Sequence, residues 1–222
     1  FPDPIEAAKI AKESGADGIT AHLREDRRHI NDNDIYRLVN EVGLPLNFEM
    51  AATKEMLDIA SLYKPHAACI VPENRQEITT EGGLDVVGQS DRLRKICDEL
   101  SSIGSRVSLF IEADEAQIIA AAELGVPVIE IHAGAYSDSN PEDRPAELEK
   151  IKNGIKIATN IGLECHVGHG LNYQNVEKIA EVRDVAELNI GHFLIAEAVF
   201  SGLGYSIKRM RELIDNARVQ QE

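Results

Sequence analysis

Short apolar runs alternate with longer segments of helical periodicity along the whole chain. Apolar residues at Leu93, Ile96, Leu100 and Ile103 recur at intervals of three and four, which is the spacing of a helix with one buried face. Between such segments lie runs of five or six mainly apolar residues, as expected for strands covered on both faces. These runs predict seven strands, at 18–23, 46–50, 67–71, 107–112, 128–132, 163–167 and 186–190.

Capping residues mark the ends of the predicted helices. Start signals lie at 2–4 (Pro-Asp-Pro) for the first helix and at Asn31 and Asp32 for the second. Four helical segments are each followed by a glycine just before a strand, where a C′ glycine is expected. These glycines are Gly15, Gly104, Gly125 and Gly162. One helix before the first strand and one after each strand gives eight predicted helices.

This alternation of strands and helices predicts a parallel sheet covered by helices. The chain contains no GxGxxG motif, so the even alternation favours a (β/α)8 TIM barrel over a doubly wound nucleotide-binding fold. We expect one barrel domain over residues 1–222. Seven strands are one short of eight, and the simplest explanation is that the first strand lies upstream of Phe1.

Charge and cysteine content narrow the class of protein. The chain has 222 residues, with 38 acidic and 23 basic side chains and a formal net charge of −15. This balance argues against nucleic acid or an anionic membrane as a partner. No apolar run approaches the roughly 18–20 residues that span a bilayer. The odd number of cysteines, in apolar surroundings at Cys69, Cys97 and Cys165, indicates a reduced, cytoplasmic protein without a disulfide framework.

Polar side chains gather where the predicted strands end. The active site of a TIM barrel lies at the C-terminal ends of its strands. Histidines, glutamates and an arginine occupy this rim: His22, Arg24, Glu49, Glu130, His132, His169 and His192. Such a concentration of titratable groups at one edge predicts a catalytic site rather than a scatter of surface histidines.

Each of these residues also has a structural interpretation. A lone His22 can be satisfied by a neighbouring carbonyl, but it opens a run that contains Arg24 and His29, which favours a functional role. Glu49 lies in an otherwise apolar strand, where a carboxylate is costly unless it is paired with an arginine or used in catalysis. Arg27 and its neighbour at 28 are interpreted as solvated or interface charges, because acidic residues accompany them.

Three further titratable residues are open to more than one interpretation. Glu130 alternates with Ile129 and Ile131, so its side chain points into the barrel if theirs point out. Alternatively, it holds a histidine of the site in place. His66 precedes a strand at the opposite rim, and His166 lies inside a strand. We interpret both histidines as structural.

Glycines after the last two strands indicate anion binding. Gly168, Gly170 and Gly191 let backbone N–H groups approach an anion closely, and barrels commonly bind phosphate at this position. Arg24 and His29 on the other side predict a second anion site. Two sites suit a pair of phosphorylated substrates.

The residue types also separate classes of chemistry. No predicted strand contains a lysine, which disfavours a Schiff-base aldolase. A divalent-metal enzyme stays an alternative, with possible ligands at His22, Glu49, His132, His169 and His192. There is no HxH on the first predicted strand and no strand-end aspartate in the later ones, so we expect no metal. A catalytically inactive barrel that serves only in assembly is the remaining alternative.

One stretch resembles a known family closely. Residues 16–30 (ADGITAHLREDRRHI) are similar to the signature of the pyridoxine 5′-phosphate synthase family. The resemblance extends over essentially the whole chain. It includes the segments 47–50, 71–73, 75–85, 130–132, 168–173 and 187–192.

The resemblance implies a TIM barrel that assembles as a homo-octamer. Members condense 1-deoxy-D-xylulose 5-phosphate with 3-amino-2-oxopropyl phosphate to pyridoxine 5′-phosphate, phosphate and water, without a metal or organic cofactor. By resemblance, His22 and Glu49 match the proton acceptors and His169 the proton donor. The family residues that bind the phosphate of the deoxyxylulose are matched by Arg24, His29 and Thr79. Those that bind the phosphate of the aminoketone are matched by Gly170, Gly191 and His192.

Two further expectations concern flanking segments. The family pattern begins with a strand that bears an Asn and an Asp-His pair, which we expect upstream of Phe1. The segment 75–83, with Gly82 and Gly83 as a hinge, is a candidate lid.

Overall fold

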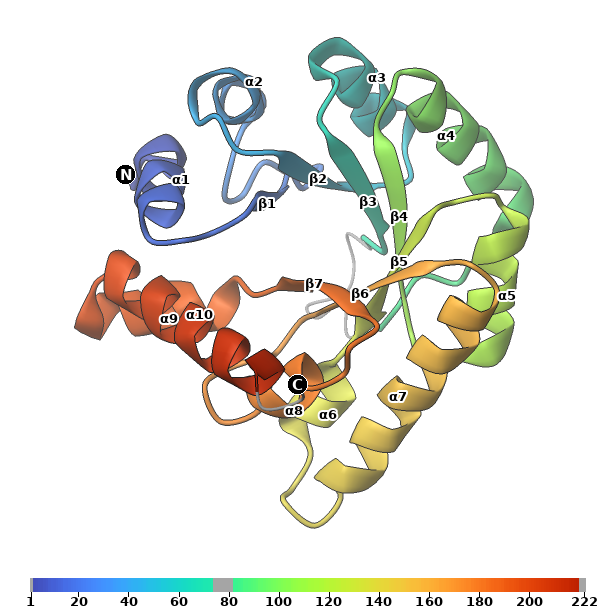
Figure 1. Cartoon of the computed structure of the whole chain (residues 1–222). Coiled ribbons are helices and arrows are strands. Elements are labelled where there is room, and N and C mark those ends of the chain that lie inside the picture. Colours follow the sequence, from blue (N-terminus) through green and yellow to red (C-terminus); the bar gives the residue numbers. More distant parts are fainter. Residues whose placement is uncertain (1, 74–81, 220–222) are drawn as a thin grey trace.

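The computed structural model describes residues 2–73 and 82–219, and they form one curled parallel sheet wrapped in helices (Figure 1). The seven predicted strands are confirmed, with ends that differ from the prediction by at most one residue. They are β1 (Ile19–His22), β2 (Leu46–Ala51), β3 (Ala67–Val71), β4 (Arg106–Ile111), β5 (Val128–His132), β6 (Glu164–Gly168) and β7 (Val185–Asn189).

The described residues form ten helices, two more than predicted. The difference arises because a five-residue helix follows β5 and because Gly202, at φ 84°, divides the last helix in two. The helices are α1 (Pro4–Glu13), α2 (Asp32–Glu41), α3 (Lys54–Tyr63), α4 (Ser90–Ser102), α5 (Glu115–Glu123), α6 (Gly134–Asp138), α7 (Arg144–Asn160), α8 (Val176–Ala180), α9 (His192–Ser201) and α10 (Leu203–Val219). None of these described helices is both long and apolar enough to cross a bilayer.

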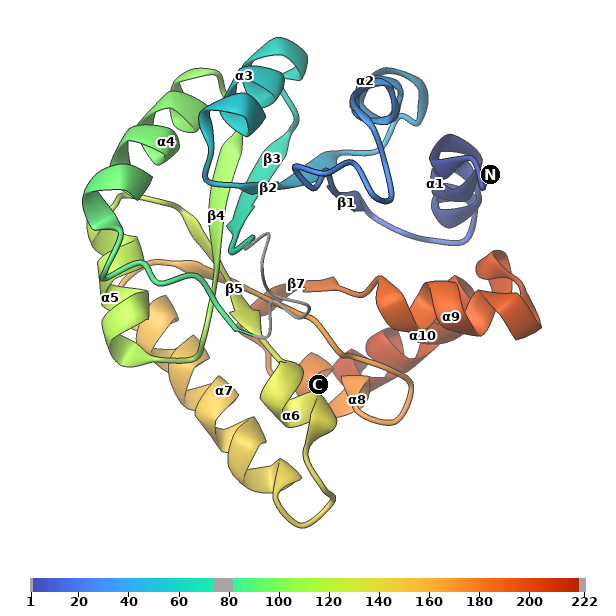
Figure 2. The same ribbon diagram turned by 180° about the vertical axis from the view of Figure 1, so that it is seen from behind.

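The sheet runs in chain order from β1 to β7, and each strand is parallel to the next. Both views show the helices outside the curl and the strand ends converging inside it (Figures 1 and 2). This is the layout of a TIM barrel, with β1 and β7 at the two ends of the sheet order. The Thr20 hydroxyl donates to Asn189 Oδ1 at 2.7 Å, so a side-chain hydrogen bond links these two strands.

Alternation along the strands separates two environments. Phe48, Met50, Ile129 and Ile131 are fully buried members of the main core, which also contains apolar residues of the helices. The residues between them, such as Glu49 and Glu130, point the other way, into the curl. A separate small apolar cluster of Cys69, Val71 and Phe110 lies on strands between those two glutamates in the sheet order. The fold therefore places Glu49 and Glu130 inside the curl beside this small apolar cluster, and the main apolar core outside it.

Local capping follows the predicted signals. Asn31 is the N-cap of α2, where its side chain accepts from the backbone of Asp34 while the Asp34 carboxylate accepts from the Asn31 backbone. This reciprocal capping box satisfies helix donors that would otherwise be unpaired. The four predicted C′ glycines all have positive φ, from 79° to 99°. The three cysteines are buried and free.

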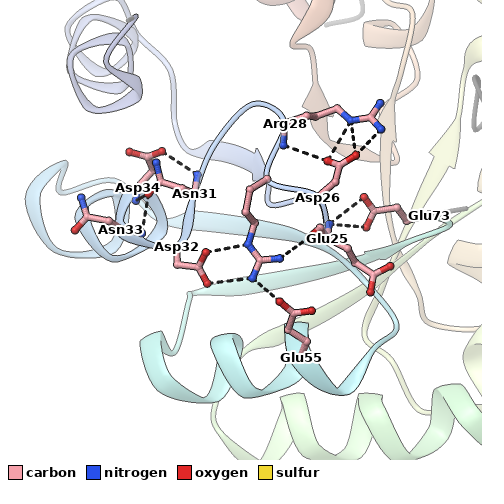
Figure 3. Close-up of polar contacts among 10 residues, drawn as sticks. Glu25, Asp26, Arg28, Asn31, Asp32, Asn33, Asp34, Glu55 and Glu73 are labelled. Atoms are coloured by element: carbon pink, nitrogen blue, oxygen red, sulfur yellow. Dashed lines mark hydrogen bonds and ion pairs between the residues drawn. The ribbon is translucent and has the colours of Figure 1, made fainter. Parts of the chain in front are cut away.

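The loop between β1 and α2 is tied down by Arg27, contrary to the expectation of a solvated charge. Its guanidinium forms a fork with Asp32, at 2.9 and 3.2 Å, and reaches Glu55 of α3 at 2.6 Å. It also donates to the Glu25 carbonyl at 2.9 Å. Figure 3 shows Asp32, Glu55 and the main chain of Glu25 around this guanidinium. The hydrogen bond to Asp32 raises the pKa of Arg27, so this charge is a fixed anchor of the loop that follows His22.

Replacement of the α2 cap tests this local account. Asn31→Ala removes the acceptor for two backbone N–H groups, so we expect the free energy of unfolding to fall by about 1 kcal/mol. Denaturant titration followed by circular dichroism measures this loss. The control is Asn33→Ala, an exposed residue of the same helix turn, which should change stability by less than about 0.5 kcal/mol. Equal losses in both variants would contradict the capping role.

Candidate active site

His22 and Glu49 are neighbours in register at the ends of β1 and β2. His22 Nδ1 and Glu49 Oε2 are 3.8 Å apart, and each side chain is 23% exposed. This separation is too long for a hydrogen bond but leaves room for the two groups to exchange a proton through a bound molecule. His22 Nε2 is buried and has no hydrogen-bond partner among the described residues.

Burial changes the protonation of both groups. Desolvation, together with the positive charge of Arg24, lowers the pKa of His22 to about 4. Desolvation raises the pKa of Glu49 to about 7. At neutral pH the imidazole is therefore uncharged and able to accept a proton, while the carboxyl group can both accept and return one. The two groups are therefore not a fixed ion pair at neutral pH.

A second carboxyl group, Glu130, lies deeper in the curl. It is 2% exposed, and its Oε2 accepts from Asn189 Nδ2 at 2.9 Å and lies 3.9 Å from Cys69 Sγ. Burial first, and then repulsion from Glu49, raises its pKa well above the ordinary value. Gly168 must be a glycine here, because a Cβ would collide with Glu130 Oε1. Burial therefore favours the protonated form of Glu130, which lies against the residue before His169.

His169 follows β6 in a left-handed backbone conformation, with φ 72°, which is uncommon for a residue other than glycine. Its ring packs edge to face on His132, with ring centroids 4.8 Å apart, and lies 6.2 Å from the ring of Phe110. The next residue, Gly170, has φ 86° and would clash with Ser137 if it carried a Cβ. This backbone turn places the imidazole at the rim.

Arg24 is held by an acidic partner. Its Nε lies 3.2 Å from Glu73 Oε1, and the Glu73 side chain is 2% exposed. Both Glu73 oxygens also accept from the backbone N–H of Glu25, at 3.2 Å (Figure 3). The carboxyl group is thus paired with the arginine by charge, without a hydrogen bond to its Nε, and it holds the turn after β1 through the Glu25 backbone. His29, in the same loop, is exposed.

The other predicted site residues lie at the same end of the sheet or outside the described part. Gly191 is the N-cap of α9 and His192 is its first residue, directly after β7. Thr79 and most of the candidate lid lie outside the described residues. No three His, Cys, Asp or Glu side chains in 2–73 and 82–219 are placed to share a metal ion. His166 contacts Glu164 at 2.9 Å, in agreement with a structural role.

The arrangement is suited to repeated proton transfer. It combines an uncharged imidazole, a carboxyl group with a pKa of about 7 and a deeply buried carboxyl group whose pKa is raised. Groups of this kind can withdraw and return protons at several atoms of one bound molecule.

Comparison with known proteins gives the family. The model of the pyridoxal phosphate biosynthesis protein PdxJ matches residues 1–216. The chain belongs to the PdxJ family. It is 58% identical over 219 residues to the pyridoxine 5′-phosphate synthase of Zymomonas mobilis, with 99% of this chain and 86% of the relative covered. It is 59% identical to the pyridoxine 5′-phosphate synthase of Rhodospirillum rubrum, with 97% and 87% covered. The predicted family membership is confirmed.

Solved structures of distant sequence share the fold. Phosphoribosyl anthranilate isomerase from Thermus thermophilus superimposes with a TM-score of 0.63 at 12% identity, over 96% of this chain and 95% of that chain. KGPDC from Streptococcus mutans gives 0.68 at 12% identity, over 96% and 92%. These likenesses support the barrel architecture of the PdxJ chain and nothing more.

Several residues of the site were not among the predicted site residues. Asn189, Glu73 and Glu112 contact Glu130, Arg24 and His132, respectively. Position at a strand end was the available signal for all three, because each is the last residue of a strand or lies within two residues of its end. Their partners, however, are distant in the sequence and are known only from the fold.

The raised pKa of Glu49 predicts a gain of stability on neutralisation. Its proton is bound more tightly in the folded state, so the stability it contributes is present below pH 4.5 and is lost as pH rises through about 7. Glu49→Gln cannot ionise. Because the side chain is 23% exposed, water offsets part of the burial cost, and we expect the variant to be about 2 kcal/mol more stable at pH 8.

Denaturant titrations at pH 5 and pH 8 measure this gain. The two proteins should be similar at pH 5, with the difference appearing at pH 8. Glu13→Gln, at an exposed site on α1, is the control for loss of one negative charge and should show no such pH dependence. A Gln variant that is no more stable at pH 8 than at pH 5, relative to wild type, would refute the burial argument.

Proposed function

We propose that this chain is a ring-closing transferase that condenses 1-deoxy-D-xylulose 5-phosphate with 3-amino-2-oxopropyl phosphate. The products are pyridoxine 5′-phosphate, phosphate and water. The observation that carries the proposal is the juxtaposition of His22 and Glu49, an uncharged base beside a carboxyl group with a pKa of about 7. Membership of the PdxJ family and relatives named pyridoxine 5′-phosphate synthase support the choice of substrates.

The chemistry needs proton carriers and no electron sink. Imine formation, dehydration, loss of phosphate and ring closure each move a proton to or from carbon, nitrogen or oxygen. In this proposal His22 and Glu49 accept protons, and His169 donates them to a leaving oxygen. Protonated Glu130 donates a hydrogen bond to a developing negative charge, a role that its deep burial and raised pKa support.

Two phosphate sites would hold the reactants together. Arg24 and His29, with Thr79, would bind the phosphate of the deoxyxylulose. Gly170, Gly191 and His192 would bind that of the aminoketone, supported by the position of Gly191 and His192 at the N-terminus of α9. Anchoring both substrates at their phosphates turns the encounter of amine and ketone into a reaction within one complex.

The first experiment is a product assay. Incubation of the protein with both phosphorylated substrates in excess EDTA should yield pyridoxine 5′-phosphate, identified by chromatography and mass spectrometry. Product that needs both substrates supports the condensation, and its persistence in EDTA argues against an essential accessible metal. Activity that chelator abolishes and a divalent metal restores would favour the metal-dependent alternative instead. Absence of product would contradict the proposal and favour the inactive barrel.

The base role of Glu49 has its own test. Glu49→Gln should fold normally and lose most turnover, by about 100-fold or more, since an amide cannot accept the proton. Steady-state kinetics at saturating substrate measures this loss, with Glu13→Gln as the matched surface control. Near-normal turnover of the Gln variant would remove Glu49 from the mechanism.

Location and assembly are part of the same proposal. Three buried, free cysteines support a reducing, cytoplasmic setting. All residues of α9 are described and none is buried; Val199 is 79% and Phe200 88% exposed. Exposed apolar side chains of this kind support a homo-oligomer, which the family resemblance makes an octamer. Light scattering coupled to size exclusion should give the mass of about eight chains, and a monomeric mass would contradict assembly.

A further inference from the structure

Glu112 and His132 form a hydrogen-bonded pair, with His132 buried and Glu112 half exposed, that the proposed reaction leaves without a role. His132 Nδ1 lies 2.7 Å from Glu112 Oε1, with the His132 side chain 8% exposed and the Glu112 side chain 47% exposed. A carboxylate accepts and does not donate, so Nδ1 carries the hydrogen of this bond. Nε2 points toward Gly134, where a Cβ would collide with it, and has no partner among the described residues. The ring is therefore fixed between Glu112 and Gly134.

The fixed ring of His132 is the surface against which His169 packs. The two ring centroids are 4.8 Å apart and the planes are inclined at 69°. Phe110 contacts both rings, at 5.1 Å from His132 and 6.2 Å from His169. The rings of His132 and Phe110 therefore both lie beside the imidazole of His169.

Glu112 is itself held in place. The backbone N–H of Gly83 donates to Glu112 Oε1 at 3.0 Å. The hydrogen bond from His132 is the main cause that lowers the pKa of Glu112, and the positive charge of His169 adds to it. The carboxylate is thus ionised at neutral pH, and its charge acts on both histidines. The titratable groups acting on His169 include His132 from β5 and Glu112 from the end of β4.

We propose that Glu112 and His132 are positioning residues for His169: the carboxylate fixes the His132 ring, and this ring orients the His169 imidazole and favours its protonated form. The role of His169 as proton donor rests on the proposed function. The contacts of Glu112 with His132 and of His132 with His169 do not depend on that function. A donor must be charged before each transfer, and a nearby carboxylate stabilises that charge. The pair would therefore act through His169 and not on the substrate.

The direct test follows His169 without any substrate. Exchange of the imidazole C2 hydrogen, measured by mass spectrometry at a series of pH values, gives a titration midpoint for each of the seven histidines. In Glu112→Gln we expect the His169 midpoint to move to lower pH by roughly half a unit or more, because the stabilising negative charge is gone. His132→Phe keeps an aromatic ring but breaks the link to Glu112, and should move the midpoint in the same direction.

Kinetics gives the second measurement. Glu112→Gln should lower kcat by about tenfold and leave KM for both substrates within about twofold, because the contact affects the donor and not binding. Glu112→Asp, which keeps the charge, should recover part of the loss. Glu115→Gln, an exposed acid at the start of α5, is the matched control and should leave both the His169 midpoint and kcat unchanged.

The outcomes separate this inference from the proposed function. A His169 midpoint that is the same in wild type, Glu112→Gln and His132→Phe would overturn the positioning role, even if the wild type makes product. Wild-type protein that makes no product would overturn the proposed function, while a shifted midpoint would still support the contact between the pair and His169. Loss of kcat in Glu112→Gln with an unchanged midpoint would also count against the positioning role.

Discussion

The constraint on which the site depends is the burial of carboxyl groups inside a curled parallel sheet. Glu49 and Glu130 face a space from which water is largely removed, and neither is neutralised by a lysine or arginine among the described contacts. They therefore hold protons that a surface glutamate would release. Three neighbours fit these buried carboxyl groups. The Asn189 amide donates a hydrogen bond to Glu130, Gly168 leaves space beside it, and His22 next to Glu49 is uncharged. Burial of these carboxyl groups lowers the stability of the folded protein, and the same burial raises their pKa values so that they carry protons near neutral pH.

The two histidines of the proposed mechanism lie in different surroundings. His22 is desolvated and lies near Arg24, which favours its neutral form. His169 packs on the ring of His132, which the Glu112 carboxylate contacts. In the proposed mechanism the same residue type thus serves as acceptor in one of these surroundings and as donor in the other.

Much of this organisation could be predicted from the sequence, because it depends on local pattern. The seven strands follow apolar runs, and the four C′ glycines follow a simple positional rule. The family followed from the run 16–30, which is specific in itself. What could not be predicted is which distant residues meet. Arg27 was interpreted as a solvated or interface charge, but Asp32 and Glu55 hold it, and the partner of Arg24 lies in the segment after β3. The register of the strands and the curl of the sheet decide those contacts, and neither can be predicted from a short stretch of sequence.

The ion pair between Arg24 and Glu73 has a consequence for discrimination among anions. A guanidinium that already faces a buried carboxylate gains little from a weakly bound monovalent ion, since one charge-assisted contact only replaces another. A doubly charged ligand that offers several oxygens gains more, because it can bind the fork while the carboxylate keeps its hydrogen bond from the Glu25 backbone. Glu73 thus favours anions of higher charge at Arg24. If Arg24 binds a phosphate as proposed, chloride and similar monovalent ions are expected to compete poorly at this position.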